Sequence, residues 1–143
     1  MIESPNEYTF EQIKIGDTAE FTEKISKSHL DGFANLSGDY NPLHMDENYV
    51  KSTKFKKQIC HGMLLASFFS KLVGMYMPGK NALYFSQTLN FQAPCYVEDE
   101  ITVKGEVIDK SDSTRMVTLK TIIHNHTGTC LVDGVAKVLV RQG

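Results

Sequence analysis

The sequence has few of the residues that mark specialised classes of protein. It contains no tryptophan, four prolines and three cysteines in 143 residues. The cysteines, Cys60, Cys95 and Cys130, are odd in number, widely spaced and form no CxxC pair, which argues against a disulfide framework and a zinc finger. We expect them to be buried or partly buried thiols in a reducing, cytoplasmic compartment.

Neither charge nor hydrophobicity is extreme. Fifteen lysines and arginines stand against seventeen aspartates and glutamates, a formal net charge of -2, whereas a dedicated nucleic-acid-binding domain is usually basic. No apolar run approaches the roughly 20 residues that cross a bilayer, and residues 1–5 lack the features of a signal peptide. We expect one cytoplasmic domain over residues 1–143, with no membrane segment and a loosely held polar stretch at residues 1–9.

The most apolar part of the chain covers residues 61–77. Its large apolar side chains lie nearly all round a helical wheel, and Lys71 is the only charged residue among them. Because a helix that is apolar on every side is a buried helix, we expect a central helix here. A second, shorter helix is expected over residues 28–36, opened by a capping box of Ser28 and Asp31.

After the central helix, apolar and polar residues alternate with a period of two, which is typical of strands. A strand-like run also precedes it. Together these patterns predict strands at residues 19–25, 83–91, 101–107, 117–123 and 135–140. Successive strands joined by short turns pair antiparallel, and one long buried helix against such a sheet is an α+β plan. Since the helix is apolar all round, we expect a hot-dog fold, a single antiparallel β-sheet wrapped around a long central helix.

Asp39 and His44 are the first candidates for chemistry. They are five residues apart, a spacing that turns one about 140° from the other on a regular helix. Gly38 and Pro42 bend the chain, and the bend lets the two side chains converge. A carboxylate beside an imidazole is an acid/base pair. The alternative is that Asp39 caps a turn and His44 is an ordinary surface or core histidine, and the spacing alone leaves both open.

Gly62 is a further candidate because it lies at the start of the predicted central helix. Free backbone N–H groups at a helix start can stabilise a developing oxyanion. A glycine at this position also suits close packing, so the spacing alone leaves both interpretations open. The preceding residue, His61, carries no signal of its own.

A metal or cofactor site has little support. His124 and His126 alternate on one predicted strand face, but no third ligand is evident. The sequence has no GxGxxG, P-loop or GxSxG motif. We therefore expect no metal ion and no cofactor.

Four lysines fall within seven residues, namely Lys51, Lys54, Lys56 and Lys57. Such a run is usually a solvated face. Here it separates the two candidate site segments, so it also suits an anionic ligand.

Taken together, these segments resemble the MaoC-like hydratases, specifically the (R)-specific enoyl-CoA hydratases. The resemblance rests on residues 37–46, SGDYNPLHMD, and residues 60–67, CHGMLLAS, with support from residues 87–91, QTLNF. The first segment matches the hydratase motif of that family, in which an aspartate is followed by Asn-Pro and by a histidine five residues after the aspartate. One departure lies in a turn, where the family often has Gly-Asp and this chain has Glu98-Asp99.

The resemblance implies a hot-dog fold that hydrates a trans-2-enoyl thioester to the (R)-3-hydroxyacyl thioester. Asp39 and His44 would hold the water between them, one taking its proton and the other protonating C2. The Gly62 backbone N–H would bind the thioester oxygen, and Asn41 and Ser67 would line or orient the site. This mechanism needs neither a metal nor a redox cofactor.

The resemblance also implies an acyl-CoA substrate and a homodimer, because a single unit leaves its sheet edge and one side of its helix uncovered. The phosphates of coenzyme A make Lys54 and Lys57 candidates for substrate binding. Three alternatives stay open: a dehydratase acting on 3-hydroxyacyl-carrier protein, a hot-dog acyl-CoA thioesterase, and a non-catalytic acyl-CoA-binding module.

Overall fold

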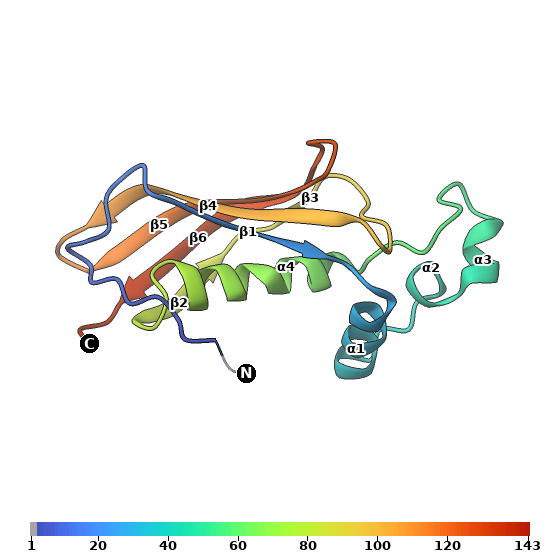
Figure 1. Cartoon of the computed structure of the whole chain (residues 1–143), viewed down its shortest axis with the longest axis horizontal. Coiled ribbons are helices and arrows are strands. Elements are labelled where there is room, and N and C mark those ends of the chain that lie inside the picture. The colour runs from blue at the N-terminus through green and yellow to red at the C-terminus, as the bar shows by residue number, and fades with distance from the viewer. Residues whose placement is uncertain (1–2) are drawn as a thin grey trace.

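The computed structural model describes residues 3–143 and shows one antiparallel sheet packed on one long helix (Figure 1). The strands are β1 (Thr18–Lys24), β2 (Ala82–Gln87), β3 (Asn90–Phe91), β4 (Glu100–Ser111), β5 (Met116–Asn125) and β6 (Cys130–Val140). The helices are α1 (Lys27–Ser37), α2 (Pro42–Met45), α3 (Glu47–Lys51), α4 (Gly62–Lys71) and the π-helical turn η1 (Leu72–Tyr76). Within this described range, no helix has the length and apolar character needed to cross a membrane.

The sheet has the strand order β1-β4-β5-β6-β2, and the short β3 pairs with β6. All of these pairings are antiparallel. Helix α4 runs along one face of the sheet, and α1, α2 and α3 lie beyond the N-terminal end of α4 (Figure 1). The predicted α+β hot-dog fold, an antiparallel sheet with a central helix, is therefore confirmed.

The core lies between the sheet and α4. Val103 and Val107 of β4 are buried, and so are Phe69 and Leu72 on the helical side. Full burial of one such side chain contributes about 1.5–3 kcal/mol. At Gly105 of β4, a Cβ atom would lie 3.0 Å from a methyl carbon of Leu72. The absence of a side chain there lets the helix approach the sheet closely.

The helix predicted over residues 61–77 is confirmed to within one residue at each end, because α4 begins at Gly62 and η1 ends at Tyr76. Its burial is less complete than predicted. Leu65 is 2% exposed, whereas Met63 is 56% exposed. The sheet covers only one side of the helix, so an apolar strip stays uncovered on the single chain.

The capping box of α1 lies two residues earlier than predicted. Ser26 is the N-cap, and its Oγ accepts the His29 N–H at 3.2 Å. In return, Nδ1 of His29 accepts the Ser26 N–H at 3.0 Å. Asp31, the residue expected to close the box with Ser28, is exposed. A histidine thus fills the place that Glu or Gln usually takes, which is why the pattern was misplaced.

The strand predicted over residues 83–91 is divided into β2 and β3. The break lies at Thr88, whose Oγ1 accepts the Val135 N–H at 2.9 Å. The Thr88 N–H still donates to the Val135 carbonyl oxygen at 2.9 Å, so the side chain takes only one of the two bonds of this pair, and regular pairing with β6 resumes at Asn90. Alternation of polar and apolar residues does not reveal such an interruption.

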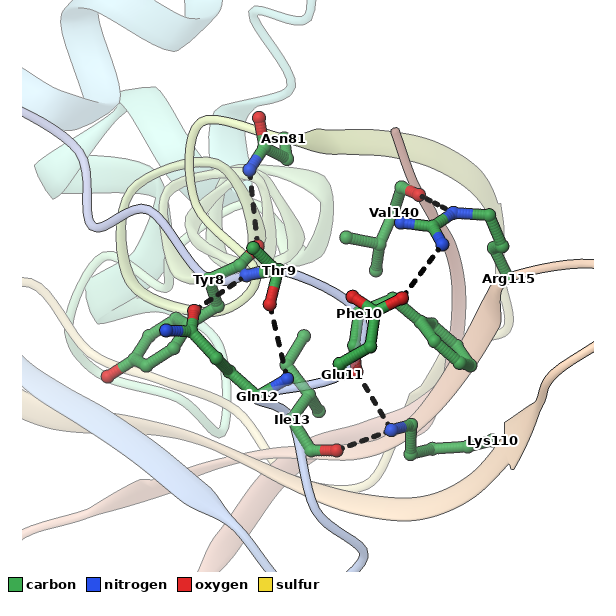
Figure 2. A network of polar contacts seen from close by, with 10 residues as sticks. All are labelled: Tyr8, Thr9, Phe10, Glu11, Gln12, Ile13, Asn81, Lys110, Arg115 and Val140. Atoms are coloured by element: carbon green, nitrogen blue, oxygen red, sulfur yellow. Dashed lines mark hydrogen bonds and ion pairs between the residues drawn. The ribbon is translucent and has the colours of Figure 1, made fainter. Parts of the chain in front are cut away.

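The N-terminal segment is not loosely held, contrary to the expectation for residues 1–9. Met1 and Ile2 lie outside the described residues, but the segment that follows is tied to the sheet end (Figure 2). Asn81 Nδ2 donates to the Tyr8 carbonyl oxygen at 3.2 Å, and the Asn6 N–H donates to the Met75 carbonyl oxygen at 2.9 Å. Just after this segment, Lys110 Nζ donates to the carbonyl oxygens of Phe10 and Ile13 at 2.8 and 2.6 Å. Lys110 belongs to β4, which extends to Ser111, past the strand predicted over residues 101–107.

The backbone at Glu98 shows why many members of the resembled family have glycine at this position of the turn. Glu98 has a φ of 77°, in the left-handed region that glycine occupies without steric cost. A glycine at this position would fit the same backbone. The turn itself is kept by Asp99, whose Oδ2 accepts the Tyr96 N–H at 3.0 Å.

Candidate active site

A cavity of about 490 Å³ opens at the N-terminal end of α4, a volume within the usual range of small-ligand sites. Three of its lining residues carry titratable polar groups, namely Asp39, His44 and His61. Most of the remaining wall is apolar, formed by Phe55, Ile59, Cys60, Met63, Leu65, Phe91, Ala93, Pro94, Cys95, Leu131 and Val132. The cavity therefore offers a long apolar surface with polar groups gathered in one place.

Asp39 follows directly after α1. The helix is capped by Gly38, whose φ of 81° is left-handed, a conformation common at helix C-termini. The Asp39 N–H donates to Ser37 Oγ at 3.1 Å, and Asp39 Oδ1 accepts the Asn41 N–H at 3.1 Å. These bonds fix the direction of the carboxylate, which stays exposed.

His44 lies on α2, the four-residue helix that begins at Pro42. The Asn41 side chain caps this helix by accepting the Leu43 N–H at 3.0 Å. Nδ1 of His44 lies 2.8 Å from the Ile59 carbonyl oxygen. Because a carbonyl oxygen only accepts, Nδ1 carries the hydrogen and Nε2 keeps a free lone pair.

The bend at Gly38 and Pro42 brings the two candidate side chains together. One potential ligand atom from each of Asp39, His44 and His61 lies within 4.8 Å of the other two. Two acceptors that share one water molecule lie about 4.5 Å apart, given hydrogen bonds of about 2.8 Å. The arrangement can therefore hold a water between a carboxylate and an imidazole.

Gly62 is the first residue of α4 and lines the same cavity. Among the hydrogen bonds of residues 3–143, none uses the Gly62 N–H as a donor. A Cβ atom at this position would lie 2.8 Å from two ring carbons of Phe91. The N–H is thus available to a ligand, and a side chain at this position fits only if the Phe91 ring or the start of α4 shifts.

Asp39, His44 and His61 are also the residues of the described chain that are grouped closely enough to hold a metal ion. Ligand atoms around one tetrahedral zinc ion lie about 3.4 Å apart, given bonds of about 2.0–2.2 Å. Moreover, His44 Nδ1 and His61 Nε2 already contact carbonyl oxygens. Because these two nitrogens are already engaged, an ion would have only Asp39, His44 Nε2 and the buried His61 Nδ1 as ligands. The expected strand pair of His124 and His126 is wrong, because β5 ends at Asn125 and His126 lies in the following turn.

The other predicted site residues lie outside this cavity wall. Ser67 Oγ donates to the Leu64 carbonyl oxygen at 2.6 Å, and Ser67 borders a separate apolar hollow on the uncovered side of α4. Lys54 Nζ lies 5.4 Å from the ring centre of Phe55, which belongs to the cavity wall. Lys57 borders a third hollow, with Nζ 5.7 Å from the Tyr96 ring centre.

Two cysteines form part of the cavity wall, which the sequence did not indicate. Cys60 and Cys95 are buried, as expected, and their Sγ atoms are 3.5 Å apart. The hydrogen bond to Cys95, and then burial, raise the pKa of the Cys60 thiol above its ordinary value. Because the thiolate is the nucleophilic form, Cys60 is unsuited to nucleophilic catalysis.

The fold belongs to the hot-dog class, and comparison with known proteins identifies the family. The family model described as MaoC like domain matches residues 10–127. The (R)-specific enoyl-CoA hydratase of Aeromonas caviae is 38% identical over 128 residues, covering 90% of this chain and 96% of the relative. The protein of the same name from Rhodospirillum rubrum is 39% identical over 131 residues, covering 92% and 90%.

Structural comparison agrees with this. The unliganded R-hydratase of Pseudomonas aeruginosa matches with a TM-score of 0.91 at 34% identity, covering 94% of this chain and 86% of that one. The chain belongs to the MaoC-like family.

Proposed function

We propose that the protein adds water to a trans-2-enoyl-CoA to give the (R)-3-hydroxyacyl-CoA, in a reversible reaction. The observation that carries this proposal is the convergence of Asp39 and His44, whose potential ligand atoms lie within 4.8 Å of each other, at the wall of the cavity that Gly62 also lines. The apolar cavity wall suits an acyl chain, and the similarity to (R)-specific enoyl-CoA hydratases supports the same substrate class.

In this mechanism the water is held by Asp39 and by Nε2 of His44, whose lone pair is free because Nδ1–H binds the Ile59 carbonyl. The pair takes a proton from the water as its oxygen bonds to C3, and it passes that proton to C2 as the C2–C3 double bond is consumed. The enzyme thereby returns to its starting protonation state. General acid–base catalysis of this kind contributes about 10²–10⁴-fold to a rate.

The Gly62 N–H binds the thioester oxygen as negative charge develops on it. The first N–H groups of α4 have no intrahelical partners, and the helix dipole adds partial positive charge at this end. A donor aimed at the developing oxyanion stabilises the transition state more than the substrate. Asn41 contributes by capping α2, which carries His44.

Crotonyl-CoA tests the reaction and separates it from the alternatives. Hydration removes the absorbance of the conjugated double bond without releasing thiol, whereas a thioesterase releases coenzyme A. A binding module would do neither. Chiral analysis of the product is expected to give the (R)-isomer, and parallel assays with crotonyl-acyl-carrier protein decide which carrier is preferred. Thiol release without loss of the double bond would contradict the proposal.

Lys54 and Lys57 are proposed to attract the phosphates of coenzyme A. Replacing both with glutamate is expected to raise KM for crotonyl-CoA about 3–10-fold and to leave kcat within about twofold, since the charges act on binding rather than on the reacting atoms. The double variant Lys120→Glu/Lys137→Glu makes the same change of net charge at exposed positions of β5 and β6. Equal KM values for the two double variants would contradict the assignment.

The uncovered surface supports a homodimer as the working form. Leu83 and Phe85 on the edge strand β2 are 55% and 69% exposed, and Met63 and Ser67 border the apolar hollow on the open side of α4. Exposed apolar patches of this kind mark interaction surfaces. A molar mass of about twice 16.1 kDa by light scattering is the expected result, and a monomeric mass would exclude the dimer.

A further inference from the structure

His61 occupies the junction of the candidate site, although the mechanism above assigns it no task. It is 2% exposed and precedes Gly62 as the N-cap of α4. N-cap side chains usually accept a hydrogen bond from the first turn, but the His61 ring makes no such bond. Its contacts lead instead to the two proposed catalytic residues.

The first contact is with the backbone of Asp39. Nε2 of His61 lies 3.0 Å from the Asp39 carbonyl oxygen. Since that oxygen can only accept, Nε2 carries the hydrogen. Asp39 sits in a turn outside the sheet, and this bond ties the turn to the start of α4.

The second contact is with the ring of His44. The two imidazole centres are 4.1 Å apart and the planes are inclined by 27°. The opposing contact of His61 is Phe33, at 4.9 Å between ring centres. His44 is therefore held through its Nδ1–H bond to Ile59 and by the stacked His61 ring.

The remaining nitrogen of His61 distinguishes this residue from a simple packing residue. Nδ1 is buried and has no hydrogen-bond partner within residues 3–143, and an unpaired buried acceptor destabilises a fold. A phenylalanine would fill the same space without that penalty. What histidine adds is the Nε2–H bond to Asp39.

The environment also keeps His61 uncharged beside His44. Burial is the main cause that lowers its pKa below the ordinary value, and the charge of protonated His44 acts in the same direction. The hydrogen bond to the Asp39 carbonyl and the Asp39 charge act in the opposite direction. A neutral His61 leaves His44 free to carry a proton during the reaction without repulsion from a second imidazolium.

We propose that His61 is a positioning residue, which holds the Asp39 turn by its Nε2–H bond and the His44 ring by stacking, and so sets their separation. This role rests on the proposed hydratase function. Small errors in the placement of reacting groups are costly, since a shift of about 1 Å can reduce a rate about 10²-fold. His61 therefore acts through Asp39 and His44 rather than on the substrate.

Three substitutions separate the two contacts. His61→Phe keeps a stacked ring and loses the donor, His61→Gln keeps a donor and loses the ring, and His61→Met, of similar size to glutamine, loses both. We expect kcat for crotonyl-CoA to fall about 10–100-fold in His61→Met, with KM within about twofold of wild type. His61→Phe and His61→Gln are each expected to retain a several-fold higher kcat than His61→Met.

The melting temperatures and kcat values of these variants distinguish a positioning role of His61 from a role in packing alone. The proposal predicts that His61→Phe melts at or above the wild-type temperature while its kcat is reduced. Wild-type kcat in His61→Met would overturn the role, and so would an equal kcat for glutamine and methionine at position 61. If His61→Phe fails to fold, the glutamine–methionine pair still gives the answer.

An independent measurement separates failure of this inference from failure of the proposed function. Long-range ¹H–¹⁵N spectra of the imidazoles report tautomers without any substrate. They are expected to show His61 with hydrogen on Nε2 and His44 with hydrogen on Nδ1, and the His44 signals are expected to shift in His61→Met. Unchanged His44 signals would overturn the positioning role even if wild-type activity is present. An inactive wild type with shifted signals would reject only the hydratase function.

Discussion

Replacing Asp39 with asparagine, or His44 with alanine, is expected to reduce hydration of crotonyl-CoA by about 10²–10⁴-fold. Asparagine keeps the size of the side chain but cannot accept a proton, and alanine removes the Nε2 lone pair. Both residues lie at the cavity wall, and neither is fully buried, so the fold should survive. Continuous absorbance assays of kcat, with circular dichroism to confirm folding, check this result.

Matched substitutions control for this experiment. Asp31→Asn and His126→Ala make the same chemical changes at exposed positions outside the cavity wall, and both should retain wild-type rates. If Asp39→Asn and His44→Ala also retain wild-type rates, the acid/base assignment is wrong. Because the two residues are proposed to share one water, the double variant should lose little more than either single variant.

The second large effect is expected at Gly62. A methyl group in Gly62→Ala would meet the Phe91 ring at 2.8 Å, so either the ring or the start of α4 must shift. The backbone N–H is still present but is displaced from the thioester oxygen. Loss of a single oxyanion donor costs about 10²–10³-fold in kcat, and we expect a reduction of about 10–100-fold for its displacement.

Two further variants show whether the clash is the cause. Gly32→Ala introduces the same methyl group into α1, where no atom lies within 4 Å of the new Cβ, and it should leave kcat unchanged. Gly62→Ala/Phe91→Ala removes the obstructing ring and should recover part of the lost rate. A wild-type kcat in Gly62→Ala would contradict the proposed role of this N–H.

The hot-dog plan could be predicted from two patterns in the sequence. The apolar residues of 61–77 lie nearly all round a helix, which indicates a buried helix, and those of the later strands alternate, which indicates the buried face of each strand. The break at Thr88 could not be predicted, because it arises from one side-chain hydrogen bond to Val135. The start of α1 was misplaced because the acidic residue three positions after Ser28 fits the usual capping box, whereas the true box pairs Ser26 with His29.

For the site, the Asn-Pro bend between Asp39 and His44 made their convergence predictable. His61 was missed because its partners, the Asp39 carbonyl and the His44 ring, are separated from it by 17 or more residues. Backbone oxygens leave no mark in a sequence. The only available signal was the position of His61 next to Gly62, which by itself indicates nothing about the direction of its ring.

The short helices α2 and α3, next to the candidate site, bury far fewer side chains than the strands of the sheet. None of the residues of α2 is buried, and α3 buries only Val50, whereas β4, β5 and β6 each bury an alternating row of side chains. Segments with few buried apolar contacts open at a smaller free energy than the global unfolding transition. The region around His44 can therefore open and reclose many times within the lifetime of one folded molecule. We expect such local opening to widen the entrance of the cavity for a bulky thioester, while the wall formed by α4 and the sheet keeps its packing.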